Sequence, residues 1–250
     1  VGAPFSTFAA DHFGWRVAYL IIGLFGCITF LGVWRYIPAD QPNRKNSPLK
    51  EVAAMGNTQV LLTLLAAAIG FGGMFAIYTY LTSILQNVTH VPEWSVMLYM
   101  VIWGMGMLVG ANAGAWLVDR KLDLAAILAL GGSAVVMLGF STVLHQPLLL
   151  ALAVFLIPTF VNGLGPALQT RLMDFAGDAQ TLAASLNHSA FNIANALGAA
   201  LGSMLLAHQF GYSALGIGGA ILSAGGLVVY LLAILVLRRS GQKEIRQPIS

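Results

Sequence analysis

The amino-acid sequence predicts an all-α, polytopic membrane protein. Three observations point to that class: 58% of the 250 residues are hydrophobic, only 8% are charged, and the mean hydropathy is +0.81. A soluble domain carries about 25% charged residues. This chain has too few charges to cover a water-exposed surface, so its apolar side chains must meet lipid.

Seven apolar stretches are long enough to cross a membrane, which takes roughly 20 residues. They cover residues 17–37, 59–85, 94–118, 124–144, 148–168, 182–207 and 213–237. The opening residues 1–10 contain Pro4 and no basic leader, and we expect them to be the end of a further helix whose start is missing. Residues 38–58 hold three prolines and three basic residues, which predicts a cytoplasmic linker between two helix bundles.

The basic residues support this set of spans, because Lys and Arg collect on the cytoplasmic side of a membrane. If successive connections alternate sides, eleven of the twelve Lys and Arg residues share one side, and only Arg16 lies on the other. We therefore expect the basic side, including the tail 238–250, to be cytoplasmic.

Groups that carry covalent chemistry are sparse. Cys27 is the single cysteine, and no Cys/His cluster has the spacing of a metal site. Acidic residues cluster only on the basic side, at Asp119 and at Asp174 with Asp178, and no His or Cys lies beside them. No charged residue falls near the middle of a full span, where an ion path would need one. The sequence predicts no enzyme, metal, cofactor or nucleic-acid partner.

Glycines recur every four residues in two spans, as Gly106, Gly110 and Gly114 and as Gly198 and Gly202. This spacing lets helix backbones approach closely in lipid. One interpretation is ordinary packing; the other is a sliding seam that allows the protein to rock between conformations.

The span 182–207 carries polar residues on one side. His188, Asn192 and Asn195 fall at positions i, i+4 and i+7. Uncompensated polar groups are costly in hydrocarbon, so this side should face protein or a watery cavity. Interhelical hydrogen bonds and cavity lining both remain open. His188 is the only candidate proton carrier within a span, and its alternative role is packing.

The span 59–85 offers an aromatic face made by Phe71, Phe75 and Tyr78. Such a face suits a cavity for amphipathic or cationic organic substrates. The alternative is contact with lipid or with the core.

The span 148–168 contains Pro158 and the Asn-Gly-Leu-Gly-Pro run at 162–166, which predict a kink. Broken helices in transporters often border the binding site. Asn162 and Gln169 are the candidate polar side chains there, and Asn112 on the glycine-bearing span is a further candidate.

Arg171, Asp174 and Asp178 follow in the next connection, at spacings of three and four residues. Their charges suit a local ion pair near a helix end. We expect a solvated structural turn.

Several short motifs carry a family resemblance. Residues 2–7, Gly-Ala-Pro-Phe-Ser-Thr, with Gly2 and Pro4, resemble the Gly/Pro-rich antiporter motif in the fifth helix of the major facilitator superfamily. Residues 13–16, Phe-Gly-Trp-Arg, resemble the short external turn that follows it in the drug:proton antiporter branch.

Residues 115–121 are similar to the superfamily's cytoplasmic loop motif between its eighth and ninth helices. Ala115 replaces the motif's first glycine, Asp119 and Arg120 match its Asp-Arg pair, and Leu122-Asp123 departs from its end. A gate and a structural charge contact are both open here. Residues 168–192, continuing to Gly198, resemble the arabinose-efflux-permease-like subgroup of that branch.

The resemblance implies a fold and a function. Residues 1–37 would be the end of helix five and all of helix six of an N-terminal bundle, and 59–237 the C-terminal six-helix bundle. The resemblance implies a bacterial inner-membrane transporter, monomeric at full length, which exports a small organic solute (drug, sugar or metabolite) in exchange for protons by alternating access. The titrating carboxylate would then lie in the missing half. An uptake permease of the same fold, or a non-transporting sensor or assembly subunit, are the alternatives.

Overall fold

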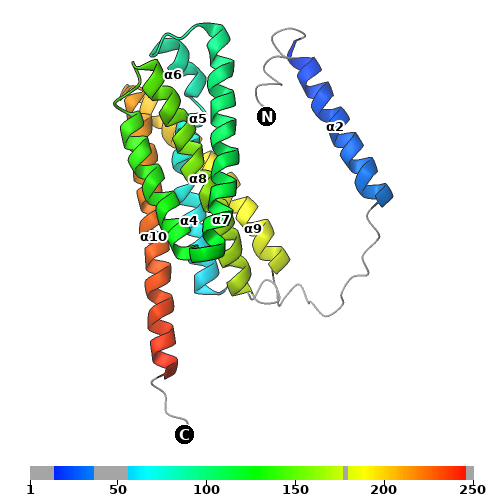
Figure 1. Cartoon of the computed structure of the whole chain (residues 1–250), viewed down its shortest axis with the longest axis vertical. Coiled ribbons are helices and arrows are strands. Elements are labelled where there is room, and N and C mark those ends of the chain that lie inside the picture. The colour runs from blue at the N-terminus through cyan, green and yellow to red at the C-terminus, as the bar shows by residue number, and fades with distance from the viewer. Residues whose placement is uncertain (1–13, 37–55, 177–179, 246–250) are drawn as a thin grey trace.

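The computed structural model describes residues 14–36, 56–176 and 180–245, and its regular elements are all helices in that part of the chain (Figure 1). The all-α class is confirmed. The helices are α2 (Trp15–Tyr36), α4 (Thr58–Gly70), α5 (Gly72–Tyr78), α6 (Leu81–Asn87), α7 (Glu93–Phe140), α8 (Pro147–Ala176), α9 (Gln180–Ala207) and α10 (Ser213–Ile245).

The described parts of the predicted spans fall on these helices, apart from the breaks noted below; residue 37 of the first span and most of the predicted linker 38–58 lie outside the described residues. Six helical segments are long and apolar enough to cross a membrane, and one of them, α7, contains two of the predicted spans. A straight helix of 48 residues would be about 72 Å long, more than twice the hydrocarbon thickness. The backbone of Lys121 is non-helical (φ −153°, ψ 86°), and the chain turns back there (Figure 1).

The span 59–85 is divided into short helices, whereas the span with two prolines forms one helix. Residues 58–87 form three consecutive helices, α4, α5 and α6, separated at Phe71 and at residues 79–80. In contrast, α8 continues without a break through Pro158 and Pro166. Pro158 and Gly163 of α8 lie close to glycines of α7, and the kink expected in this helix stays a prediction.

Both glycine repeats pack helices together inside the bundle. A side chain at Gly106 or Gly110 would collide with the carbonyl oxygen of Phe155 or Thr159 in α8, and Gly114 lies against Gly163. The matched order of these contacts makes the first half of α7 parallel to α8. The structure shows the close packing that both interpretations share, and the sliding seam stays a prediction.

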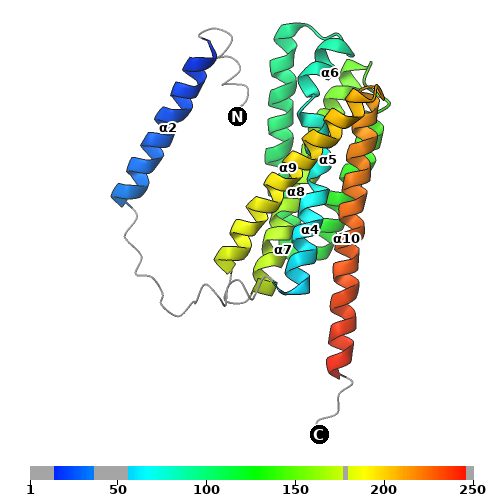
Figure 2. The same cartoon turned by 180° about the vertical axis from the view of Figure 1, so that it is seen from behind.

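The second glycine repeat joins α9 to α5. Gly198 lies against the backbone of Gly72, and Gly202 lies against the ring of Tyr80. The Tyr80 hydroxyl also donates a hydrogen bond to the carbonyl oxygen of Ala199, at 3.1 Å. These contacts leave α4 and α5 between α9 and α10 (Figure 2).

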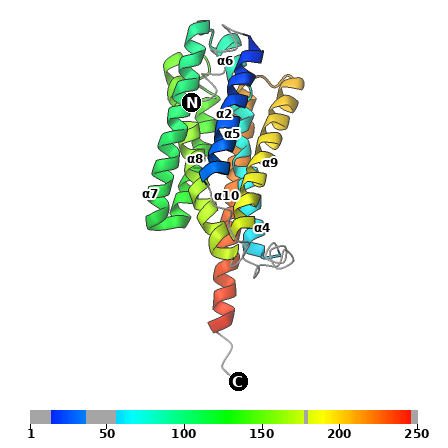
Figure 3. The ribbon, with the colours of Figure 1, turned by 90° about the vertical axis from the view of Figure 1, so that its right-hand side faces the viewer.

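The outer surface of the bundle suits lipid. Large apolar side chains such as Leu148 (83% exposed) and Val135 (69%) project from it. The first half of α7, α8, α5 and α9 lie across one face of the bundle, and α10 lies behind them (Figure 3). We call this the open face; its side chains are described below.

Candidate functional site

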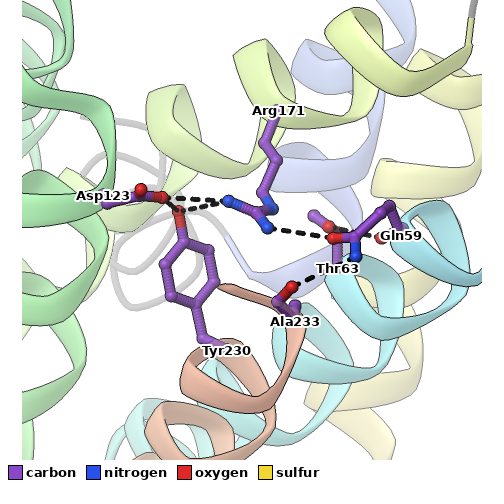
Figure 4. Close-up of polar contacts among 6 residues, drawn as sticks. All are labelled: Gln59, Thr63, Asp123, Arg171, Tyr230 and Ala233. Atoms are coloured by element: carbon purple, nitrogen blue, oxygen red, sulfur yellow. Dashed lines mark hydrogen bonds and ion pairs between the residues drawn. The ribbon is translucent and has the colours of Figure 1, made fainter. Parts of the chain in front are cut away.

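A buried arginine joins four helices at the end of the bundle where α4 begins and α8 ends. Arg171 of α8 is only 3% exposed. Its Nη1 donates to Oδ1 of Asp123 at 2.9 Å, and its Nη2 donates to Oε1 of Gln59 at 3.0 Å. The Tyr230 hydroxyl donates to the same Asp123 oxygen at 2.9 Å (Figure 4). We call these four residues the Arg171 cluster.

Further hydrogen bonds surround the Arg171 cluster. Nε2 of Gln59 donates to the carbonyl oxygen of Ala233 at 3.1 Å, and the Thr63 hydroxyl donates to the carbonyl oxygen of Gln59 at 2.7 Å (Figure 4). Nε of Arg171 is the one buried side-chain polar atom without a partner among the described residues. The carboxylate of Asp123 thus neutralises the arginine, and the cluster connects the start of α4 and the end of α8 to the interior of α7 and α10.

The solvated turn expected at Arg171 is wrong for that residue. The helix α8 continues to Ala176, so Arg171 follows Leu164 and Leu168 on the buried side of the helix at spacings of seven and three. The helical spacing of Arg171 from these two leucines was the sequence feature that could have predicted its burial. Asp174 is exposed as expected, and Asp178 lies outside the described residues.

The residues of the predicted loop motif, 115–121, do not take part in the Arg171 cluster. Ala115, Asp119 and Arg120 are all exposed, and the Arg120 guanidinium lies 3.7 Å from the centre of the Trp116 ring. The acid that enters the cluster is Asp123, where the motif match ends. A gating role for Asp119 and Arg120 stays a prediction. Gly2 and Pro4 lie outside the described residues.

The predicted aromatic residues divide between two contacts. Phe71 and Phe75 are buried, and both rings meet Phe191 of α9 edge-on, with ring centres 4.9 and 5.1 Å apart. Tyr78 is half-buried, and its ring centre lies 5.0 Å from that of Trp103 in α7. The sequence pattern did not identify Phe191 and Trp103 as partners of these rings, because nothing in the surrounding sequence distinguishes them from ordinary core residues.

Two predicted amides lie on the open face. Nδ2 of Asn162 donates to the carbonyl oxygen of Pro158 at 3.1 Å and lies 3.7 Å from the Met74 sulfur. Oε1 of Gln169 accepts a hydrogen bond of 2.8 Å from Nδ2 of Asn187, which joins α8 to α9. The residue that makes this interhelical bond directly precedes the predicted polar side of α9.

Asn112 does not lie with Asn162 and Gln169. Its Nδ2 donates to the carbonyl oxygen of Leu108 in its own helix at 2.7 Å, and its side chain is exposed. It lies about 120–160° around α7 from the three glycines that meet α8.

His188, Asn192 and Asn195 are all exposed on α9. None of the three side chains forms a hydrogen bond with another described residue, so the interhelical hydrogen bonds considered for them are absent from this part of the chain. The three remain together on one side of the helix and point away from the core.

The neighbours of α9 show where that side points. Around the helix axis, Leu201 and Leu205 meet α10, and Gly198 and Gly202 meet α5. At about 100° per residue, the polar side follows next, beside α5 and away from α10. An apolar exposed side formed by Ile193, Leu197 and Met204 then completes the turn. The apolar side suits lipid, whereas the polar side adjoins the open face and suits protein or water.

Comparison with known proteins agrees with this architecture. The family model described as Major Facilitator Superfamily matches residues 1–186. The inner membrane transport protein YdhP of Escherichia coli (strain K12) is 31% identical over 245 residues, which are 97% of this chain and 61% of the relative.

Two further relatives have names that mention solutes. The chloramphenicol resistance protein of Streptomyces lividans is 27% identical over 242 residues (94% of this chain, 59% of the relative). A probable sugar efflux transporter of Mannheimia succiniciproducens is 23% identical over 243 residues (96% and 60%). The chain thus spans about three fifths of the length of the curated relatives it matches.

Proposed function

The chain belongs to the Major Facilitator Superfamily, and we propose on that basis that the protein containing it exports a small organic solute across the bacterial inner membrane in exchange for protons. Relatives named for chloramphenicol resistance and for sugar efflux support export of such a solute. The observation that carries the proposal is the polar side of α9, which has no partner among the described helices and adjoins the open face.

The open face supplies one wall of a solute pathway. Asn162 in α8 and Asn192 and Asn195 in α9 each lie near the middle of their helices, and therefore near the middle of the membrane. Tyr78 borders the same face from α5. A second bundle facing this wall would enclose the solute, and rocking of the two bundles would open the cavity to each side of the membrane in turn.

Alternating access also requires that each bundle moves as a unit. Two glycine seams and the Arg171 cluster connect the helices from α4 to α10, so a shift of one helix disturbs backbone contacts with its neighbours. We propose that the Arg171 cluster keeps this bundle rigid at its cytoplasmic end while the bundle rocks.

Proton coupling needs a titrating group in the membrane. The described parts of the helical spans hold no Asp or Glu near their centres, and we propose that a coupling carboxylate lies in the rest of the protein. His188 is the titratable side chain on the polar side of α9, and it is the proton-carrying candidate from this chain.

Direction and coupling are tested together in cells that lack their own efflux pumps. Expression of the full-length protein should lower the accumulation of radiolabelled chloramphenicol relative to an empty vector, and a protonophore should abolish the difference. Raised accumulation would indicate an uptake permease instead. Unchanged accumulation of chloramphenicol, sugars and other small solutes would contradict transport and favour a sensor or assembly role.

A further inference from the structure

We infer that the transported solute is an uncharged, hydrogen-bonding molecule. This inference rests on the proposed function and names the class of solute that the open face fits. It also decides against the organic cations that the aromatic pattern alone allowed.

The first argument is charge balance. Among the described residues, the open face holds no Asp, Glu, Lys or Arg between the ends of its helices. The one buried charge nearby, Arg171, is already neutralised by Asp123 at 2.9 Å. A cationic solute at the membrane centre would therefore meet no counter-charge from this half of the pathway, and an anionic one would meet only His188. Burial of an unpaired charge is strongly unfavourable.

The second argument is the hydrogen-bonding capacity that remains unused. Asn192 and Asn195 are exposed and make no side-chain hydrogen bond with a described residue, so each amide offers two N–H donors and one acceptor oxygen. Asn162 uses its Nδ2 and keeps its Oδ1 free, and the Tyr78 hydroxyl likewise has no partner in the described part. Paired donors and acceptors match hydroxyl, carbonyl and amide groups.

The third argument concerns the aromatic rings, because cation recognition needs an accessible ring face. Phe71 and Phe75 are only 4% and 8% exposed and are both occupied by Phe191. Trp103 is 3% exposed and lies against Tyr78. These three rings therefore serve as packing, and the half-buried Tyr78 and Phe191 leave only part of their faces open to a cation.

The experiment compares probes of different charge in the same cells. Export is measured for chloramphenicol, which is uncharged, for ethidium, a cation, and for fluorescein, an anion, with the full-length protein. We expect export of chloramphenicol alone. Asn192→Ala and Asn195→Ala should each raise the half-saturating chloramphenicol concentration about fivefold, the effect of one lost hydrogen bond. Asn112→Ala is the matched control and should change nothing, because its amide bonds only to its own helix.

A charge placed in the site gives the second readout. Asn192→Asp should weaken chloramphenicol export and admit ethidium, provided that the amount of variant in the membrane equals that of the unmodified protein. Export of ethidium by the unmodified protein, unaffected by the Asn192 and Asn195 variants, would overturn the inference and leave the proposed function standing. Export of fluorescein by the unmodified protein would likewise overturn the inference. If none of the three probes is exported, the same comparison is made with radiolabelled sugars, and failure there as well would overturn both the inference and the proposed function.

Discussion

Removing the carboxylate of Asp123 should destabilise the bundle more than removing any other acid on that side. Asp123→Ala leaves the Arg171 guanidinium, 3% exposed, without a counter-charge, and leaves the Tyr230 hydroxyl without its acceptor. Breaking a buried ion pair costs about 3–5 kcal/mol. The Asp123 side chain is 49% exposed, and water screens part of the interaction, so we expect about 2–3 kcal/mol.

The measurement is chaotrope unfolding of the purified full-length protein in detergent. Asp119→Ala is the control, because Asp119 is exposed, lies four residues earlier and makes no ion pair with a described residue. It should change the free energy of unfolding by less than about 0.5 kcal/mol. Adding Arg171→Met to Asp123→Ala should recover stability, because the uncompensated charge is then gone.

Equal destabilisation by the two alanine variants would refute this reasoning. It would mean that Arg171 is solvated in the folded protein, in spite of its burial, and that the hydrogen bonds of the Arg171 cluster do not hold the helices together. Failure of Arg171→Met to recover any stability would show that the cost came from lost packing and not from the charge.

Three other results are expected. Gly110→Leu should reduce the amount of folded protein in detergent gel filtration, because the added side chain meets the Thr159 carbonyl oxygen, which is part of the backbone and cannot move aside. Gly139→Leu is the control in the same assay and should be tolerated, because Gly139 has open space around it. Tyr80→Phe should cost about 1 kcal/mol of unfolding free energy through the lost bond to Ala199, and no measurable loss would show that water replaces it. Alkaline phosphatase fused after residue 250 should be inactive and a fluorescent protein there bright, since the phosphatase needs oxidising conditions outside the cytoplasm; an active phosphatase would place the tail outside.

The helices and their class were predictable from local composition. In a bilayer each crossing segment must satisfy its backbone hydrogen bonds internally, so about 20 apolar residues suffice to indicate a helix wherever they occur. The two spans merged in α7 were separable in the sequence because Asp119, Arg120 and Lys121 interrupt the apolar run, and the non-helical backbone lies at the last of these.

The contacts of the candidate site were predictable only in part. Periodicity grouped His188, Asn192 and Asn195 on one side of α9, and the structure keeps them together. It did not indicate that Asn187, one position earlier, is the residue that bonds to α8. A step of one residue turns a side chain by about 100°, so the choice between neighbours depends on how the helix is rotated against its partners.

The sequence by itself determined that this chain crosses lipid repeatedly as helices and which side of each helix is polar. Tertiary structure alone decided which residues pair with Arg171, that Asp123 and not Asp119 is its acid, and that residues 58–87 divide at Phe71. The physical reason is the range of the interactions. Hydropathy acts on each segment separately, whereas burial, pairing and helix continuity are set by contacts between residues far apart in the chain, such as Arg171 with Gln59 and Gly106 with Pro158.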